Sequence, residues 1–146
     1  MNVRSASGQA VDRRTRGDRG CRHERLEAHP RSVARAREAV TEFAAGHGAS
    51  EAQCNAIALA ISEAVANAIV HAYAGGNEDE VVEVRASVDE HALVAVVRDD
   101  GVGIGHAGPS EGLGLGLPLI ARLSDELQIE SRSPPGTSVR MTFSIG

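Results

Sequence analysis

Hydrophobic positions recur at helical spacing in two long segments of the first half of the chain. The first segment follows Pro30, which suits the first turn of a helix, and extends to about His47. The second begins at Ser50, which can form a capping box with Gln53, and extends through about Tyr73. Because this second segment is apolar on nearly every side, we expect a central, buried helix. Glycines end both segments: Gly46 and Gly48, then Gly75 and Gly76.

Runs rich in β-branched residues occupy most of the second half and indicate strands. We expect strands at Arg22–Ala28, Val81–Val88, Ala92–Val97, Leu127–Ser131 and Ser138–Ser144, a third helix at Leu115–Leu123, and turns at Asp89–His91 and Pro134–Gly136. This order predicts one α+β domain, a two-layer α/β sandwich with three helices on one face of a mostly antiparallel sheet.

Charge is distributed unevenly along the 146 residues. Residues 1–25 hold seven Arg and three acidic residues, whereas the rest holds 8 Arg and 17 acidic residues. We expect residues 1–22 to be a disordered Arg-rich tail and residues 23–146 to be the domain. An acidic domain with 2% aromatic residues disfavours nucleic-acid binding. Lysine is absent from the sequence, which excludes a P-loop.

The sequence shows neither an export signal nor a run of about 20 uncharged residues. Its longest apolar stretch, Asn55–Val70, is interrupted by Glu63 and Asn67. We therefore expect a soluble, cytoplasmic protein that contacts no membrane. Cys21, expected in the tail, and Cys54, expected in a helix, lack metal-ligand spacing and are expected to be reduced.

Three polar residues form a narrow stripe on the second helix. Glu63, Asn67 and His71 are spaced four residues apart, so they share one face among apolar neighbours. Buried there, an amide and a carboxylate would need hydrogen-bond partners, which a ligand or metal ion could supply. The stripe alone leaves a second interpretation open, in which it is the solvated face of the helix.

Two glycine-rich motifs follow the stripe. Asp99–Ile104 reads Asp-x-Gly-x-Gly and ends a strand, so its carboxylate could accept an exocyclic amine while Gly101 and Gly103 let a flat base lie close to the backbone. Gly112–Leu117 leads into a helix with glycines at alternate positions, and free backbone N–H groups there suit phosphates. Each motif alone could be an ordinary turn or loop, but the three in this order indicate a nucleotide site.

The same motifs resemble those of the GHKL ATPase superfamily. Glu63–Tyr73 resembles its N box, Asp99–Gly103 its G1 box and Gly112–Gly116 its G2 box, while Pro135–Thr137 resembles the element before its last strand. The phrase at Ser62–Ala68 is most similar to the RsbW/SpoIIAB anti-sigma factors, which are serine-protein kinases. The resemblance spans about Glu24–Ile145 and implies the Bergerat ATP-binding fold.

The resemblance also implies a role for each residue. Asn67 would coordinate Mg²⁺, Glu63 would be the catalytic base, and Asp99 would bind the adenine amine with support from Thr137. The amides of the glycine run would hold the phosphates. The remaining residues of the implied ATP site are His71, Gly101, Gly103, Ile104, Gly112, Leu113, Gly114, Leu115 and Gly116.

The implied function is a switch kinase that binds ATP and Mg²⁺, sequesters a sigma factor and phosphorylates a serine on a STAS-domain antagonist. Arg37 is a candidate partner contact, or equally a surface arginine lying over the core. The lid, His106–Glu111, is short for a kinase, so a non-catalytic nucleotide-binding regulatory module stays open, as does a homodimer. A sensor histidine kinase is disfavoured, because no helix pair with a phospho-accepting histidine precedes the domain.

Overall fold

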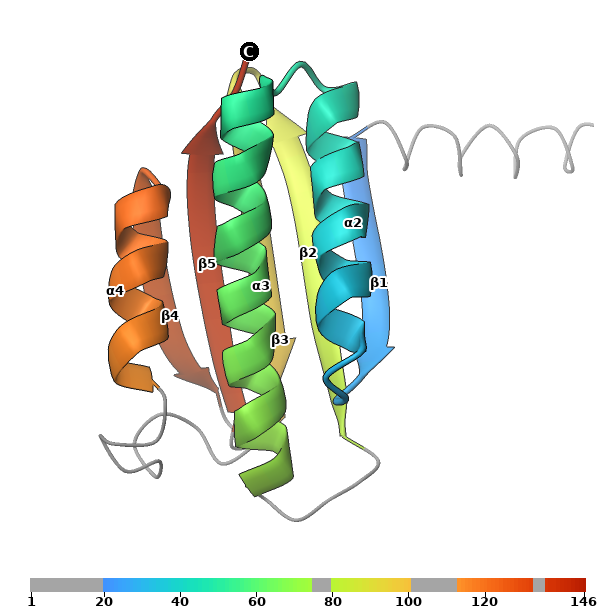
Figure 1. The fold of residues 1–146 in the computed structure, drawn as a ribbon, viewed down its shortest axis with the longest axis vertical. Helices are drawn as coiled ribbons and strands as arrows, with labels where there is room; N and C mark the ends of the chain where they lie inside the picture. The colour runs from blue at the N-terminus through green and yellow to red at the C-terminus, as the bar shows by residue number, and fades with distance from the viewer. Residues whose placement is uncertain (1–19, 75–79, 101–112, 133–135) are drawn as a thin grey trace, which may run out of the picture.

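The protein consists of a layer of helices packed on one face of a sheet (Figure 1). This is seen in a computed structural model, which describes residues 20–74, 80–100, 113–132 and 136–146. Within these ranges the elements follow the order β1, α2, α3, β2, β3, α4, β4, β5. The two-layer α+β architecture predicted from the sequence is therefore confirmed.

The sheet has five strands in the order β1-β2-β3-β5-β4. Their bounds are Cys21–Glu27 for β1, Val81–Asp89 for β2, Ala92–Asp99 for β3, Glu126–Arg132 for β4 and Gly136–Ser144 for β5. Every pairing between these strands is antiparallel, where the sequence predicted a mostly antiparallel sheet. β3 occupies the centre of the sheet, between β2 and β5.

Local sequence signals explain where the first two helices begin and end. α2 spans Ser32–Gly46 and ends in a Schellman motif, in which Gly48 has a φ of 94° and its N–H donates to the Ala45 carbonyl. α3 spans Glu51–Ala74. The predicted capping box is present at its start, because Ser50 N donates to Gln53 Oε1 (2.8 Å) and Gln53 N donates to Ser50 Oγ (3.1 Å).

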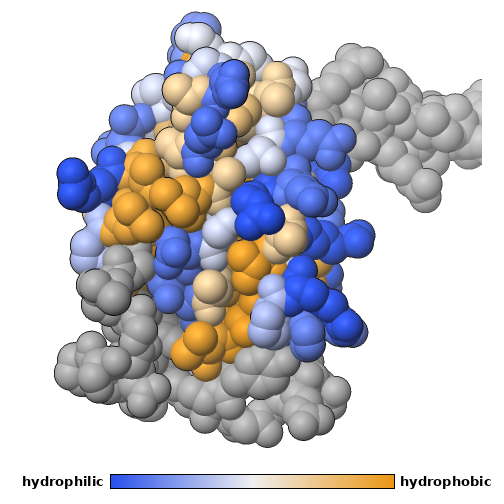
Figure 2. All heavy atoms as spheres, in the orientation of Figure 1, coloured by the Kyte–Doolittle hydropathy of each residue, from blue (hydrophilic) through white to orange (hydrophobic). Residues whose placement is uncertain are grey.

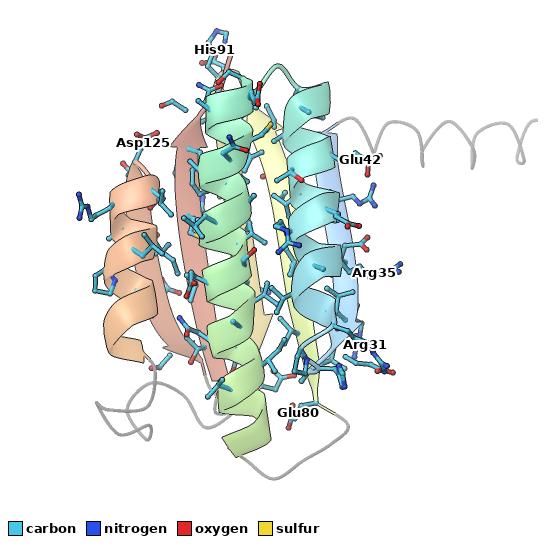
Figure 3. The ribbon with its side chains drawn as sticks, viewed as in Figure 1. Arg31, Arg35, Glu42, Glu80, His91 and Asp125 are labelled. Carbon is cyan, nitrogen blue, oxygen red and sulfur yellow. The ribbon has the colours of Figure 1, made fainter. Side chains whose placement is uncertain are left out.

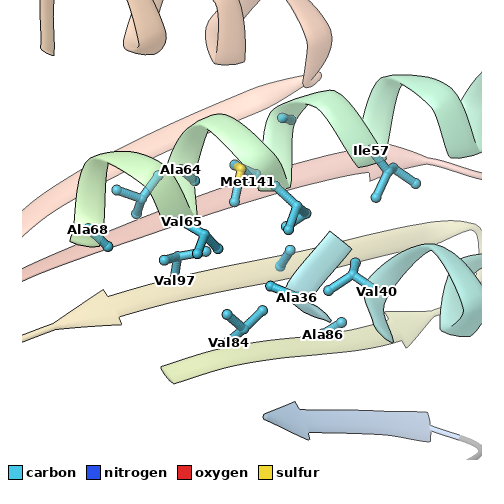
Figure 4. Packing of buried hydrophobic residues seen from close by; sticks show 14 of the residues in the cluster. Ala36, Val40, Ile57, Ala64, Val65, Ala68, Val84, Ala86, Val97 and Met141 are labelled. Atoms are coloured by element: carbon cyan, nitrogen blue, oxygen red, sulfur yellow. The ribbon is translucent and has the colours of Figure 1, made fainter. Parts of the chain in front are cut away.

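The core lies between the helices and the sheet. Alternate residues of β3 face the helices, so Leu93, Ala95 and Val97 are fully buried. In Figure 4, Val65 of α3 packs against Val97. α4, at Leu113–Leu123, covers the β5 and β4 side and contributes Ile120 to the same core.

α3 is the central helix, but it is not buried on every side as predicted. Leu59 and Val70 on its outer face are 44% and 49% exposed. Figure 2 shows apolar areas among the polar residues of the helical face. By length and composition alone, Glu51–Val70 could also cross a membrane. Here its opposite face packs on the sheet, as the core helix of a folded domain does.

The other predicted boundaries differ from the structure by a few residues. Pro30 precedes α2 in a turn instead of lying in its first turn. Cys21, expected in the tail, is the first residue of β1. Asp89 pairs with Ala92, which leaves a two-residue turn, and Gly136 pairs with Arg132 instead of forming the turn. At Cys21, Asp89 and Gly136, strand pairing extends further than the local sequence signals suggest.

Candidate functional site

Four element ends meet at one end of the domain. The carboxy-terminal half of α3 lies there beside the end of β3, the start of β5 and the start of α4 (Figure 1). The antiparallel pairing of β3 with β5 explains this, since β3 ends where β5 begins. Residues that are distant in sequence are therefore brought to the same edge of the sheet.

Asp99 and Thr137 form a directly opposed pair across β3 and β5 at this edge. Both side chains face the helical layer, and they are only 3% and 2% exposed. Thr137 Oγ1 is buried and has no hydrogen-bond partner among the described residues. An unsatisfied buried hydroxyl costs about 1–3 kcal/mol, so this atom is suited to receive a polar ligand.

Gly136 allows the two strands to approach closely beside this pair. A Cβ atom at Gly136 would lie 2.4 Å from the Asp99 carbonyl oxygen. Any larger residue would therefore displace the backbone of Asp99, whose carboxyl group is part of the candidate site. The sequence places Gly136 in a turn and in the family-like element Pro135–Thr137, but it does not show this close approach, which results from a strand pairing.

Glu63 and Asn67 contribute the polar groups of α3. Both residues are half-buried, but the amide nitrogen of Asn67 is buried and has no hydrogen-bond partner among the described residues. A purely solvated helix face would not bury this atom. A phosphate oxygen would supply the acceptor that the amide N–H group needs.

The structure describes only part of the predicted site. His71 lies on α3, although its side chain is outside the described residues, and Leu113, Gly114, Leu115 and Gly116 belong to the first turns of α4. Helix α4 thus begins at Leu113, earlier than the predicted start at Leu115. Gly101, Gly103, Ile104, Gly112 and the lid at His106–Glu111 lie outside the described residues.

Arg37 is tied to the helix that carries Glu63. Its Nη1 donates to Ser62 Oγ (3.3 Å), and the Ser62 hydroxyl donates to the Ala58 carbonyl (2.7 Å). The contact joins α2 to α3 one residue before Glu63. Arg37 is a candidate partner contact from the sequence, but its link to Ser62 could not be predicted, because residues 25 positions apart meet only when the two helices pack.

The described residues contain no group of three or more His, Cys, Asp or Glu side chains that could hold a metal ion. A protein-only metal cage is therefore not formed by this part of the chain. A Mg²⁺ ion that bridges nucleotide phosphates needs only one or two protein oxygen ligands and keeps several waters. The amide of Asn67 fits that smaller requirement.

The fold and these groups define a nucleotide-binding domain of the two-layer α/β type. The family described as the histidine kinase-like ATPase domain matches residues 26–143, and the chain belongs to this family. Membership implies that the chain binds ATP. As its motifs indicated, the chain is of the RsbW/SpoIIAB type within the GHKL superfamily.

Curated relatives include two proteins named anti-sigma F factor. The one from Clostridium novyi (strain NT) is 31% identical over 117 residues, which cover 73% of this chain and 81% of the relative. The one from Caldanaerobacter subterraneus subsp. tengcongensis is 34% identical over 122 residues, which cover 76% and 84%. The similarity thus spans most of both proteins.

Two solved structures share the fold. The RsbU and RsbW domains of Rv1364c from Mycobacterium tuberculosis superpose with a TM-score of 0.68 and 26% identity, covering 86% of this chain and 32% of that chain. The SiaB-SiaC complex from Pseudomonas aeruginosa also gives a TM-score of 0.68, with 16% identity, covering 97% and 99%. The second likeness shows the fold alone.

Proposed function

We propose that the chain is an anti-sigma factor that binds ATP with Mg²⁺ and phosphorylates a serine of a STAS-domain antagonist, exchanging its sigma factor for that antagonist. The observation that supports this most strongly is the buried Asp99–Thr137 pair, with orphaned polar atoms on Thr137 and Asn67 at the same end of the domain. The anti-sigma F factors among the relatives support the class of partner. We expect the protein to act in the cytoplasm, where sigma factors are found.

In this proposal Asp99 recognises the adenine. Its carboxylate accepts a hydrogen bond from the exocyclic amine, and the Thr137 hydroxyl supports the base through a water. Adenine presents this amine as a donor whereas guanine presents a carbonyl oxygen, so an acceptor held at the end of β3 selects ATP over GTP. The backbone amides at the start of α4 hold the phosphates.

Asn67 would hold the Mg²⁺ ion through its amide oxygen, and the ion would neutralise charge on the phosphates. Glu63, one turn earlier on the same face, accepts the proton of the substrate serine hydroxyl. The serine oxygen then bonds to the γ-phosphorus, and the bond from that phosphorus to the β–γ bridging oxygen breaks. ADP leaves with the electron pair of the broken bond.

We place the protein-partner surface on α2. Arg31, which directly precedes α2, and Arg35 on α2 project toward the β1 side of the domain (Figure 3), where they border an open hollow of about 580 Å³. Both side chains are more than 70% exposed and pair with Glu27 and Glu24 at 3.0 and 3.7 Å. Exposed ion pairs contribute little to stability, so partner acidic groups can compete for these arginines.

The kinase assignment is tested by incubating purified protein with ATP, Mg²⁺ and the antagonist. We expect phosphoserine on the antagonist, and we expect Glu63→Gln to abolish transfer while calorimetry shows unchanged ATP affinity. Glu126→Gln, an exposed position on β4, is the matched control and should retain full transfer. Normal transfer by Glu63→Gln would contradict the role of Glu63. Tight ATP binding without transfer by the wild-type protein would favour a non-catalytic regulatory module instead.

A further inference from the structure

A second polar site lies on the face of the sheet that the helices leave uncovered. It is a pocket of about 120 Å³ lined by Val96, Arg98, Gln128, Glu130, Ser138 and Arg140. These residues come from the three neighbouring strands β3, β5 and β4. None of them belongs to the nucleotide site described above.

Strand register explains why these side chains meet. Ser138 of β5 lies between Arg98 of β3 and Glu130 of β4. In the adjoining row, Arg140 lies between Val96 and Gln128. Because successive side chains of a strand point to opposite faces, both rows face away from the helices.

The pocket carries an excess of positive charge. Two guanidinium groups line it, against the single carboxylate of Glu130. No carboxylate of the described residues lies within 4.0 Å of the Arg98 or Arg140 side-chain nitrogens. The two arginines are therefore not held in close ion pairs within this part of the chain.

Arg98 also has an unsatisfied donor. Its Nε atom is buried and has no hydrogen-bond partner among the described residues. Leaving a buried charged donor unpaired costs more free energy than leaving a neutral one unpaired. Oxyanions are the best partners for guanidinium groups, because they accept charge-assisted and often bidentate hydrogen bonds.

We propose that this pocket binds one small oxyanion, a phosphate group held by Arg98 and Arg140 with the Ser138 hydroxyl as a further donor. The volume suits a single phosphate group and is too small for a nucleotide. The phosphate can be free or part of a small phosphorylated molecule. Since Arg98 and Ser138 directly neighbour Asp99 and Thr137 in sequence, the anion site lies behind the adenine-recognition pair, on the other face of the same two strands.

The test is an NMR titration of the ¹⁵N-labelled full chain with inorganic phosphate at constant ionic strength, repeated with glycerol phosphate. We expect saturable shifts of the amides of Arg98, Gln128, Ser138 and Arg140. If only glycerol phosphate gives them, the ligand is a phosphorylated molecule. Arg98→Gln and Arg140→Gln should each weaken binding by about tenfold or more. Glu130→Gln should tighten binding several-fold, because Glu130 carries the one negative charge among the described residues that line the pocket.

Arg85→Gln is the matched control, since Arg85 is an exposed arginine on the same sheet face outside the pocket. It should leave phosphate affinity unchanged. The proposal is overturned if Arg85→Gln weakens binding as much as Arg98→Gln, or if the saturable shifts fall only near Asn67 and the start of α4. It is also overturned if the pocket amides shift with protein concentration and not with phosphate, because a second copy of the chain would then cover this face. The Glu130→Gln variant keeps the test informative if Arg98→Gln does not fold.

Discussion

Asp99 and Thr137 lie directly opposite each other at the last pairing of β3 with β5, and each is almost completely buried. Neither residue is near the other in sequence, so the antiparallel register alone brings them together. The pair places the carboxyl group of Asp99 opposite the hydroxyl group of Thr137. The hydroxyl oxygen has no hydrogen-bond partner within the described ranges. Substitutions near this pair can therefore change the stability of the protein and its affinity for nucleotide to different extents.

Replacing Thr137 with Val should change stability and binding in opposite directions. The substitution keeps the shape of the side chain and removes an unsatisfied buried hydroxyl, so the ligand-free protein should become up to about 1 kcal/mol more stable. ATP affinity should fall several-fold, because the proposed support of the adenine by the Thr137 hydroxyl would be lost. Urea unfolding and calorimetry measure the two effects. A variant that is less stable without ligand would show that the hydroxyl has a structural partner.

Replacing Gly136 with Ala should disturb the site through the backbone. The new methyl group would lie 2.4 Å from the Asp99 carbonyl oxygen, so one of the strands must move. We expect a loss of about 1–3 kcal/mol in the free energy of unfolding, together with weaker ATP binding. Gly46→Ala is the control, because a Cβ there meets nothing within 4 Å and replaces a glycine in a helix. That variant should be equally or slightly more stable.

Replacing Asn67 with Ala should remove the dependence of ATP binding on Mg²⁺. For the wild-type protein we expect ATP affinity to rise when Mg²⁺ is added, because in the proposed site the amide oxygen of Asn67 would hold the ion against the phosphates. In the variant, affinities measured with Mg²⁺ and with a chelator should converge. Unchanged stimulation by Mg²⁺ would show that other groups hold the ion.

Substitutions of Arg37 and Ser62 should show whether Arg37 contacts the partner directly or acts through its hydrogen bond between α2 and α3. Arg37→Ala removes both the hydrogen bond to Ser62 and the charge on α2, whereas Ser62→Ala removes only the hydrogen bond. We expect Arg37→Ala to weaken sigma-factor binding by about tenfold or more, a typical effect of losing an interface arginine. Ser62→Ala should change it much less. Equal losses in both variants would instead indicate that the link between α2 and α3 determines partner affinity.

The pair of Glu83 and His23 should give a small acid-sensitive contribution to stability. His23 Nε2 lies 2.9 Å from Glu83 Oε2, and its hydrogen bond lowers the pKa of Glu83 below its ordinary value of 4.5. A carboxyl group whose pKa is lowered on folding stabilises the folded protein above its unfolded pKa, and this contribution is lost as pH falls through the folded value. Both side chains are partly exposed, so the effect should stay below about 1 kcal/mol. Urea unfolding between pH 6 and 3 should show it, and His23→Ala should reduce it.

Much of the fold follows from local sequence signals. The capping box of Ser50 and Gln53 and the glycine at position 48 set helix ends that the structure reproduces. The polar stripe of α3 was also visible, because helical spacing is a local property. For such features a short segment contains all the necessary information.

Features that depend on pairing between distant segments could not be predicted in this way. The opposition of Asp99 and Thr137, the close approach of Gly136 and the contact of Arg37 with Ser62 all depend on how strands and helices pack. The exposed outer face of α3 is a further example, since composition alone suggested burial all round. Periodicity identifies a helix, but only its neighbours determine which sides are covered.

The short hairpin between β2 and β3 has a consequence for mutation by insertion. Only Glu90 and His91 connect the paired residues Asp89 and Ala92, and Glu90 already adopts a φ of 54°. One extra residue in β3 beyond this turn would rotate every following side chain to the other side of the sheet. Asp99 would then face the bare side and Arg98 the helices, so a single inserted codon would replace an acidic side chain with a basic one at the proposed adenine site.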